Sequence, residues 1–112
     1  MRYKPIPPIF VIEGNDVGVF RTVGDAQLQL EPDDVRTTQY QVYDSTGAKL
    51  SIAATSAGVF ISADEVPPDG KAELATALAT FLIQSGDIPE DAPRPSFVEL
   101  IKRAEEYGTR AK

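Results

Sequence analysis

The stretch Tyr40-Gln41-Val42-Tyr43-Asp44-Ser45-Thr46-Gly47-Ala48-Lys49-Leu50 decides the fold, because it combines a strand, a turn and the start of a second strand. Its first part is rich in aromatic and β-branched residues, which favour strands. Asp44 can accept hydrogen bonds from the backbone ahead of it, and Gly47 tolerates a positive φ. Apolar residues then alternate with polar or small ones over residues 48–54. We therefore expect an antiparallel hairpin whose first strand covers residues 36–44.

Further strands are predicted on both sides of this hairpin. Residues 9–12 are continuously apolar, which is typical of a strand that is covered on both faces. The turn sequence Gly14-Asn15-Asp16 separates them from a second strand at residues 17–21, so the two form a hairpin. A further strand is expected at residues 59–63.

Three segments predict helices. Thr22 can cap a short first helix, which Pro32 ends by about Glu31. The second helix has an apolar face and ends at Gly86; the residues of this face are Leu74, Leu78, Phe81 and Leu82. The third begins at the capping box Ser96-Phe97-Val98-Glu99 and ends at Gly108.

These elements predict one α+β domain over residues 1–112, in the order ββαβββαα. The expected architecture is an about five-stranded, mostly antiparallel sheet with helices packed on one face. A chain of 112 residues with 42% hydrophobic residues can bury a core without disulfides or metals.

The side-chain chemistry is limited, since the chain contains no His, Cys or Trp. The usual general base, thiolate nucleophile and soft metal ligands are therefore missing. Lys49 and Ser51 are the one conceivable Ser–Lys pair, and a solvent-facing strand explains them equally well. The run Glu31-Pro32-Asp33-Asp34 offers oxygen ligands, but the spacing of a calcium loop is absent. We expect a protein that is not an enzyme and uses no metal or cofactor.

The charge is the more informative property. The formal net charge is −6, and residues 1–92 carry 14 acidic against 6 basic side chains. Such a surface argues against nucleic-acid binding and suits a basic protein partner. The apolar run at residues 9–12 is too short for a signal peptide or a membrane span. We therefore expect a complete, cytoplasmic chain that does not bind membranes.

Residues 10–50 resemble small acidic bacterial proteins known as uncharacterised reading frames. The shared features are a leading strand pair, a short capped helix after Thr22, and the run LEPDDV…YQVYDSTGAKL. Some proteins of this kind look like immunity proteins, which bind and neutralise a toxin. The resemblance implies a toxin-binding role and transfers no catalytic residue.

The first hypothesis is therefore an immunity-type protein that covers a basic toxin domain with its acidic surface. The acidic residues expected to bind the partner are Glu31, Asp33, Asp34, Asp44, Asp64 and Glu65. Tyr43 is expected to anchor the partner from the open face of the sheet. A homodimeric structural or regulatory module is the first alternative, and a small-molecule binder with a concave acidic pocket is the second.

Overall fold

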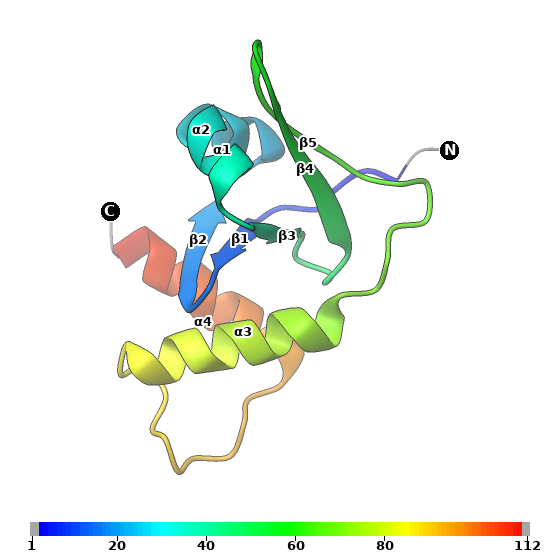
Figure 1. Cartoon of the computed structure of the whole chain (residues 1–112). Coiled ribbons are helices and arrows are strands. Elements are labelled where there is room, and N and C mark those ends of the chain that lie inside the picture. The colour runs from blue at the N-terminus through cyan, green and yellow to red at the C-terminus, as the bar shows by residue number, and fades with distance from the viewer. Residues whose placement is uncertain (1–2, 111–112) are drawn as a thin grey trace.

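The computed structural model describes residues 3–110 (Figure 1). The elements in chain order are β1 (Ile9–Glu13), β2 (Asp16–Phe20), α1 (Val23–Gln29), α2 (Pro32–Thr37), β3 (Gln41–Tyr43), β4 (Lys49–Thr55), β5 (Gly58–Ser62), α3 (Lys71–Gln84) and α4 (Phe97–Arg110). The chain is α+β, as the sequence predicts.

The strands form a five-stranded sheet in the order β2-β1-β3-β4-β5, and every neighbouring pair is antiparallel. β1 and β2 form the predicted hairpin, with Glu13 opposite Asp16 next to its turn. β1 also pairs with β3, so Phe10 lies opposite Tyr43. This long-range pairing joins the two predicted hairpin units into one sheet.

Helices cover both faces of the sheet, so the expectation of helices on a single face is wrong. On one face, Phe10 and Ile12 pack with the apolar residues of α3 and α4. On the other face, Ile9 and Val11 pack with Ala26 of α1. The physical reason lies in β1. Successive side chains of a strand point to opposite faces, so a continuously apolar strand needs a cover on both sides. Figure 1 shows α3 and α4 below the sheet and α1 and α2 above it.

The helix α2 replaces the start of the predicted strand over residues 36–44, and β3 is correspondingly short. Pro32 ends the first helix region as expected, but it also occupies the first turn of α2. Proline is favoured there, because the N–H that it lacks would have no partner within the helix. Asp33 and Asp34 in the first turn and Arg36 in the last turn complement the helix dipole. These end effects outweigh the strand preference of Thr37 and Thr38.

The predicted helix caps are present. Thr22 Oγ1 accepts a hydrogen bond from the Asp25 N–H (3.0 Å), and Ser96 Oγ accepts one from Glu99 (3.2 Å). Gly86 adopts a φ of 86° just after α3. Gly108, however, does not end α4, which continues to Arg110. A Cβ at Gly108 would lie 3.0 Å from Val19 Cβ, so this glycine lets α4 approach β2 closely.

Candidate functional site

Asp44 is buried in the turn between β3 and β4, although the sequence suggested it as a partner-binding residue. Its Oδ1 accepts from the backbone N–H groups of Thr46 (2.9 Å) and Ala48 (3.1 Å) and from Thr46 Oγ1 (2.7 Å). Its Oδ2 accepts from the Ile6 N–H (3.0 Å) and the Tyr3 hydroxyl. The turn role predicted for Asp44 is confirmed, and the partner-binding role is wrong because protein donors surround the carboxylate.

These hydrogen bonds also set the charge state of Asp44. Burial alone raises the pKa of a carboxyl group, because it disfavours the charged form. Here the donors from Tyr3, Thr46 and Ile6 outweigh burial and lower the pKa of Asp44 below its ordinary value. The ionised carboxylate therefore holds the N-terminal segment against the β3–β4 turn.

Tyr43 is not on an open face, which corrects the expectation that it anchors a partner. Its side chain is 3% exposed and belongs to the core beneath α3 and α4. The Tyr43 hydroxyl donates a hydrogen bond to Glu73 Oε2 on α3 (2.9 Å). Burial, followed by the contact with Glu73, raises the pKa of Tyr43 to about 12. Val42 and Tyr43 point to opposite faces of the sheet, and both faces are covered.

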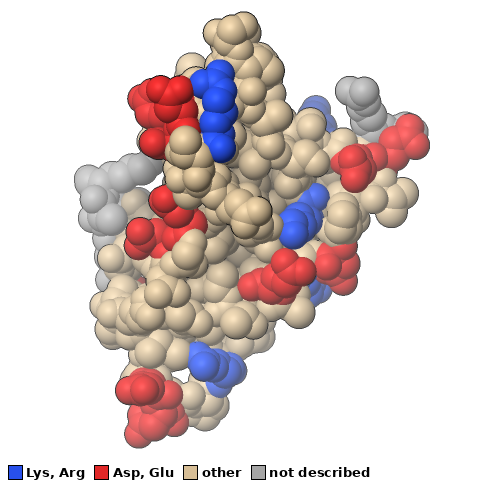
Figure 2. Space-filling model, viewed as in Figure 1, with Lys and Arg blue, Asp and Glu red and all other residues tan. Residues whose placement is uncertain are grey.

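Asp64 and Glu65 are exposed, as the sequence suggested, in the loop that follows β5. They are remote from α2. Arg36 of α2 contacts Thr55, which lies at the turn end of the β4–β5 hairpin. Asp64 follows the opposite end of β5, and the length of β5 between these two ends is about 16 Å. Figure 2 shows the acidic atoms of one side of the molecule in separate groups with basic atoms between them. The suggested acidic residues therefore do not form one surface.

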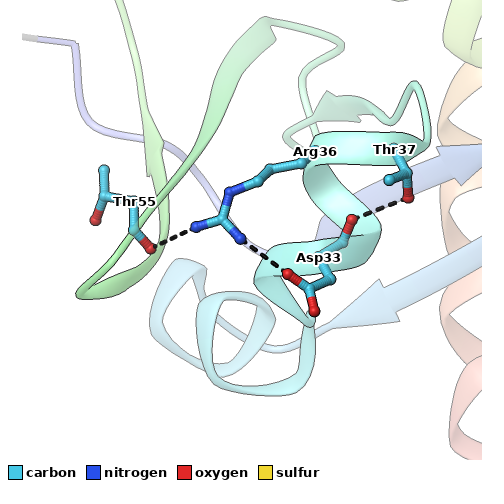
Figure 3. A network of polar contacts seen from close by, with 4 residues as sticks. All are labelled: Asp33, Arg36, Thr37 and Thr55. Atoms are coloured by element: carbon cyan, nitrogen blue, oxygen red, sulfur yellow. Dashed lines mark hydrogen bonds and ion pairs between the residues drawn. The ribbon is translucent and has the colours of Figure 1, made fainter.

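The acidic residues of α2 are exposed together. Asp33 Oδ1 pairs with Arg36 Nη1 at 2.9 Å, and Arg36 Nη2 donates to the Thr55 carbonyl (3.2 Å), so this arginine links α2 to the β4–β5 turn (Figure 3). The carboxylates of Glu31 and Asp34 make no hydrogen bond or ion pair with other described residues. Three carboxylates, at Glu31, Asp33 and Asp34, outnumber the single cation of Arg36, so α2 and its N-cap carry a net negative charge.

A groove next to α2 carries two further carboxylates that the sequence reasoning missed. It has a volume of about 250 Å³ and lies on the α1 side of the sheet, at the turn end of the β1–β2 hairpin. Its apolar walls include Val11, Phe20, Leu30 and Tyr40. Glu13 and Asp16, which face each other across the hairpin, also line it.

The electrostatic environment of this groove is negative. Burial raises the pKa of Tyr40, and the charges of Glu13 and Asp34 raise it further. Both carboxylates therefore act on the same phenol, which places α2 and the groove in one acidic region. We call this region, made of Glu13, Asp16, Glu31, Asp33 and Asp34, the acidic edge.

One signal in the sequence could have indicated the groove. The predicted turn is Gly14-Asn15-Asp16; a two-residue turn of Gly14-Asn15 alone would have placed Glu13 and Asp16 opposite each other, as the structure does. The contribution of Tyr40 could not be foreseen in this way, because it depends on the pairing of β1 with β3.

Among residues 3–110, no three acidic side chains lie close enough together to hold a metal ion. Lys49 Nζ lies 3.7 Å from Glu73 Oε2, so this lysine faces a carboxylate. Within the same residues, no helix is both long and apolar enough to cross a membrane. No protein-family model, curated protein or solved structure matches the chain. The resemblance to immunity-type proteins therefore stays a prediction.

Proposed function

We propose that the chain is a non-catalytic cytoplasmic protein that binds a basic protein partner through the acidic edge. The immunity type, in which that partner is a toxin domain, is the specific form of this proposal. The observation that carries it is the state of the acidic-edge carboxylates. Glu13, Asp16, Glu31 and Asp34 are exposed and make no hydrogen bond or ion pair with other described residues.

This state matters because a carboxylate without a protein partner keeps its full charge available to a ligand. Groups of exposed like charges steer an oppositely charged protein during its approach and raise the association rate. Like charges placed close together also repel each other, so their grouping does not serve stability. The acidic edge is therefore better suited to recognition than to holding the fold.

The test uses the purified chain, immobilised, to capture proteins from a lysate of its source organism at low salt. Matched double variants identify the surface. E31Q/D34N removes two charges from the acidic edge, and D64N/E65Q removes two from the remote loop. Both change the formal net charge from −6 to −4.

We expect a basic protein that wild type and D64N/E65Q retain and that E31Q/D34N releases. The captured protein, produced separately, must then bind the purified chain, and an immunity role further requires that the complex loses a toxic activity of that protein. Retention of no basic protein, or equal retention by both variants, contradicts the proposal.

A second candidate function is self-association, and a different surface favours it. Beyond Lys49, the outer face of the β4–β5 hairpin is exposed and carries no charged residue, with Phe60 (49% exposed) opposite Ala53. Two copies of an acidic protein repel each other least where they carry no charge. Sedimentation of wild type and F60S tests this role: a dimer that the variant loses supports it, and a wild-type monomer at all concentrations excludes it.

A further inference from the structure

The groove of the acidic edge has features that specify its occupant more closely than charge alone. Glu13 and Asp16, which line its turn end, are both exposed, so a side chain can enter the groove from solvent. The side chains of Leu30 and Tyr40 form walls on one side, and the ring of Phe20 lies over Gly18 on the other. A Cβ at position 18 would be only 3.1 Å from Phe20 Cε2, so the glycine allows the ring to occupy this place.

The carboxylates lie at one end of these apolar walls. Glu13 and Asp16 are opposite each other in the register of β1 and β2, next to the turn, whereas Val11 and Gly18 are opposite each other two residues farther along. Because alternate residues of a strand share a face, all four positions lie on the α1 side of the sheet. The groove is thus apolar along its length and doubly negative at its turn end.

We propose that this groove receives one Lys or Arg side chain of the basic protein partner. The inference rests on the proposed function and deepens it by naming the group that is recognised. Lys and Arg are the side chains that combine an aliphatic stem with a cationic head. The stem would contact Phe20, Leu30 and Tyr40, and the head would pair with Glu13 and Asp16.

Other ligand classes fit the groove less well. An anion would be repelled by both carboxylates. An uncharged apolar group would cover them and remove their water without offering a hydrogen bond, which is unfavourable. A free metal ion needs a larger set of converging oxygen ligands, and no such set occurs among residues 3–110. The described residues that line the groove include no Lys or Arg, so none of them supplies the cation from within the groove.

The experiment uses the side-chain analogues n-butylammonium and n-butylguanidinium as probes. Each is titrated into ¹⁵N-labelled protein, and the backbone amide shifts are followed by NMR. Titrations with n-butanol and with sodium chloride provide the controls for the apolar stem and for ionic strength. The proteins compared are wild type, E13Q/D16N and D64N/E65Q, which has the same net charge as the groove variant.

We expect saturable shifts centred on Val17, Gly18 and Tyr40 with at least one of the two cations. The apparent affinity should fall by about fivefold or more in E13Q/D16N, as expected for the loss of charge-assisted bonds, and should stay within about twofold of wild type in D64N/E65Q. The single variants E13Q and D16N repeat the test if the double variant does not fold. Shifts spread over all carboxylates, equal affinity in E13Q/D16N, or equal binding of n-butanol would overturn the proposal.

The outcome separates this inference from the proposed function. If E31Q/D34N loses a basic partner while neither cation binds the groove, the partner is recognised at α2 and the groove proposal fails alone. If the cations bind the groove but no basic protein is captured, the proposed function fails, and the groove is left as a binding site for cationic side chains that is separate from that function.

Discussion

Two acidic turns of this molecule look alike in sequence and differ in what surrounds them. Asp44 precedes the turn between β3 and β4, and Glu13 and Asp16 flank the turn between β1 and β2. Five hydrogen bonds reach the Asp44 carboxylate from other parts of the chain. No hydrogen bond or ion pair from a described residue reaches the carboxylate of Glu13 or of Asp16. The number of protein donors around a carboxylate, more than the residue type, decides whether it holds the fold or is available to a partner.

The largest expected effect is that of removing the buried carboxylate. D44A would leave the backbone N–H groups of Ile6, Thr46 and Ala48 without their acceptor, so the free energy of unfolding should fall by about 3–5 kcal/mol. Urea denaturation measures this loss. D64A is the control, since Asp64 is exposed in the loop after β5 and pairs with no described residue, so its removal should change stability by less than about 0.5 kcal/mol. Similar losses in both variants would remove the distinction between the two kinds of carboxylate.

Acid should reveal the same difference in the unmodified protein. The pKa of Asp44 is lower in the folded state than in the unfolded state, because the surrounding donors favour its charged form. Its contribution is therefore complete above the unfolded pKa, about 3.9, and is lost as the pH falls through the lower folded value. The loss should be smaller than in D44A, since a protonated carboxyl still accepts some of the bonds. Unfolding measured across this pH range should show a shallower slope in D44N, and an unchanged slope would contradict this assignment.

Alkali should act through Tyr43, the neighbour of Asp44. Its pKa is raised to about 12, so the neutral phenol is favoured in the folded state. The contribution of Tyr43 to the free energy of unfolding is fully present below the unfolded pKa of about 10. It is lost as the pH rises through about 12, which lowers stability by on the order of 2 kcal/mol. Denaturation at pH 9 to 12 should show a smaller loss in Y43F than in wild type; Tyr40, whose pKa is also raised, accounts for a part that remains in the variant. A loss of equal size in Y43F would assign it to another group.

The smallest expected effect concerns the acidic edge. Glu13 and Asp16 are like charges opposite each other in an antiparallel pair, which is unfavourable. E13Q/D16N should therefore raise the free energy of unfolding slightly, by about 0.2–0.5 kcal/mol. D64N/E65Q controls for the change in net charge. A clear loss of stability in E13Q/D16N would mean that these carboxylates hold the fold, as Asp44 does.

The sequence predicts those parts of the fold that depend on neighbouring residues. The apolar run of β1, the cap at Thr22 and the turn at Asp44 follow from local patterns, and all three are present. The strand expected to begin at Arg36 fails because helix-end effects at Pro32, Asp33 and Asp34 outweigh the strand propensity of two threonines. The predicted role of Tyr43 fails because α3, far along the chain, covers its face of the sheet. The groove depends on the β1–β3 pairing and on the position of Leu30, neither of which a local pattern specifies.

The association rate of the captured partner with the purified chain, measured by stopped flow at several salt concentrations, tests the central claim most directly. We predict that the rate constant for wild type falls steeply as salt rises, because salt screens the acidic edge. At low salt the rate constant for E31Q/D34N should be several-fold lower than for wild type, and that for D64N/E65Q should be closer to it. A rate constant that is independent of salt, or equal in the two variants, would contradict the claim that the acidic edge recognises the partner.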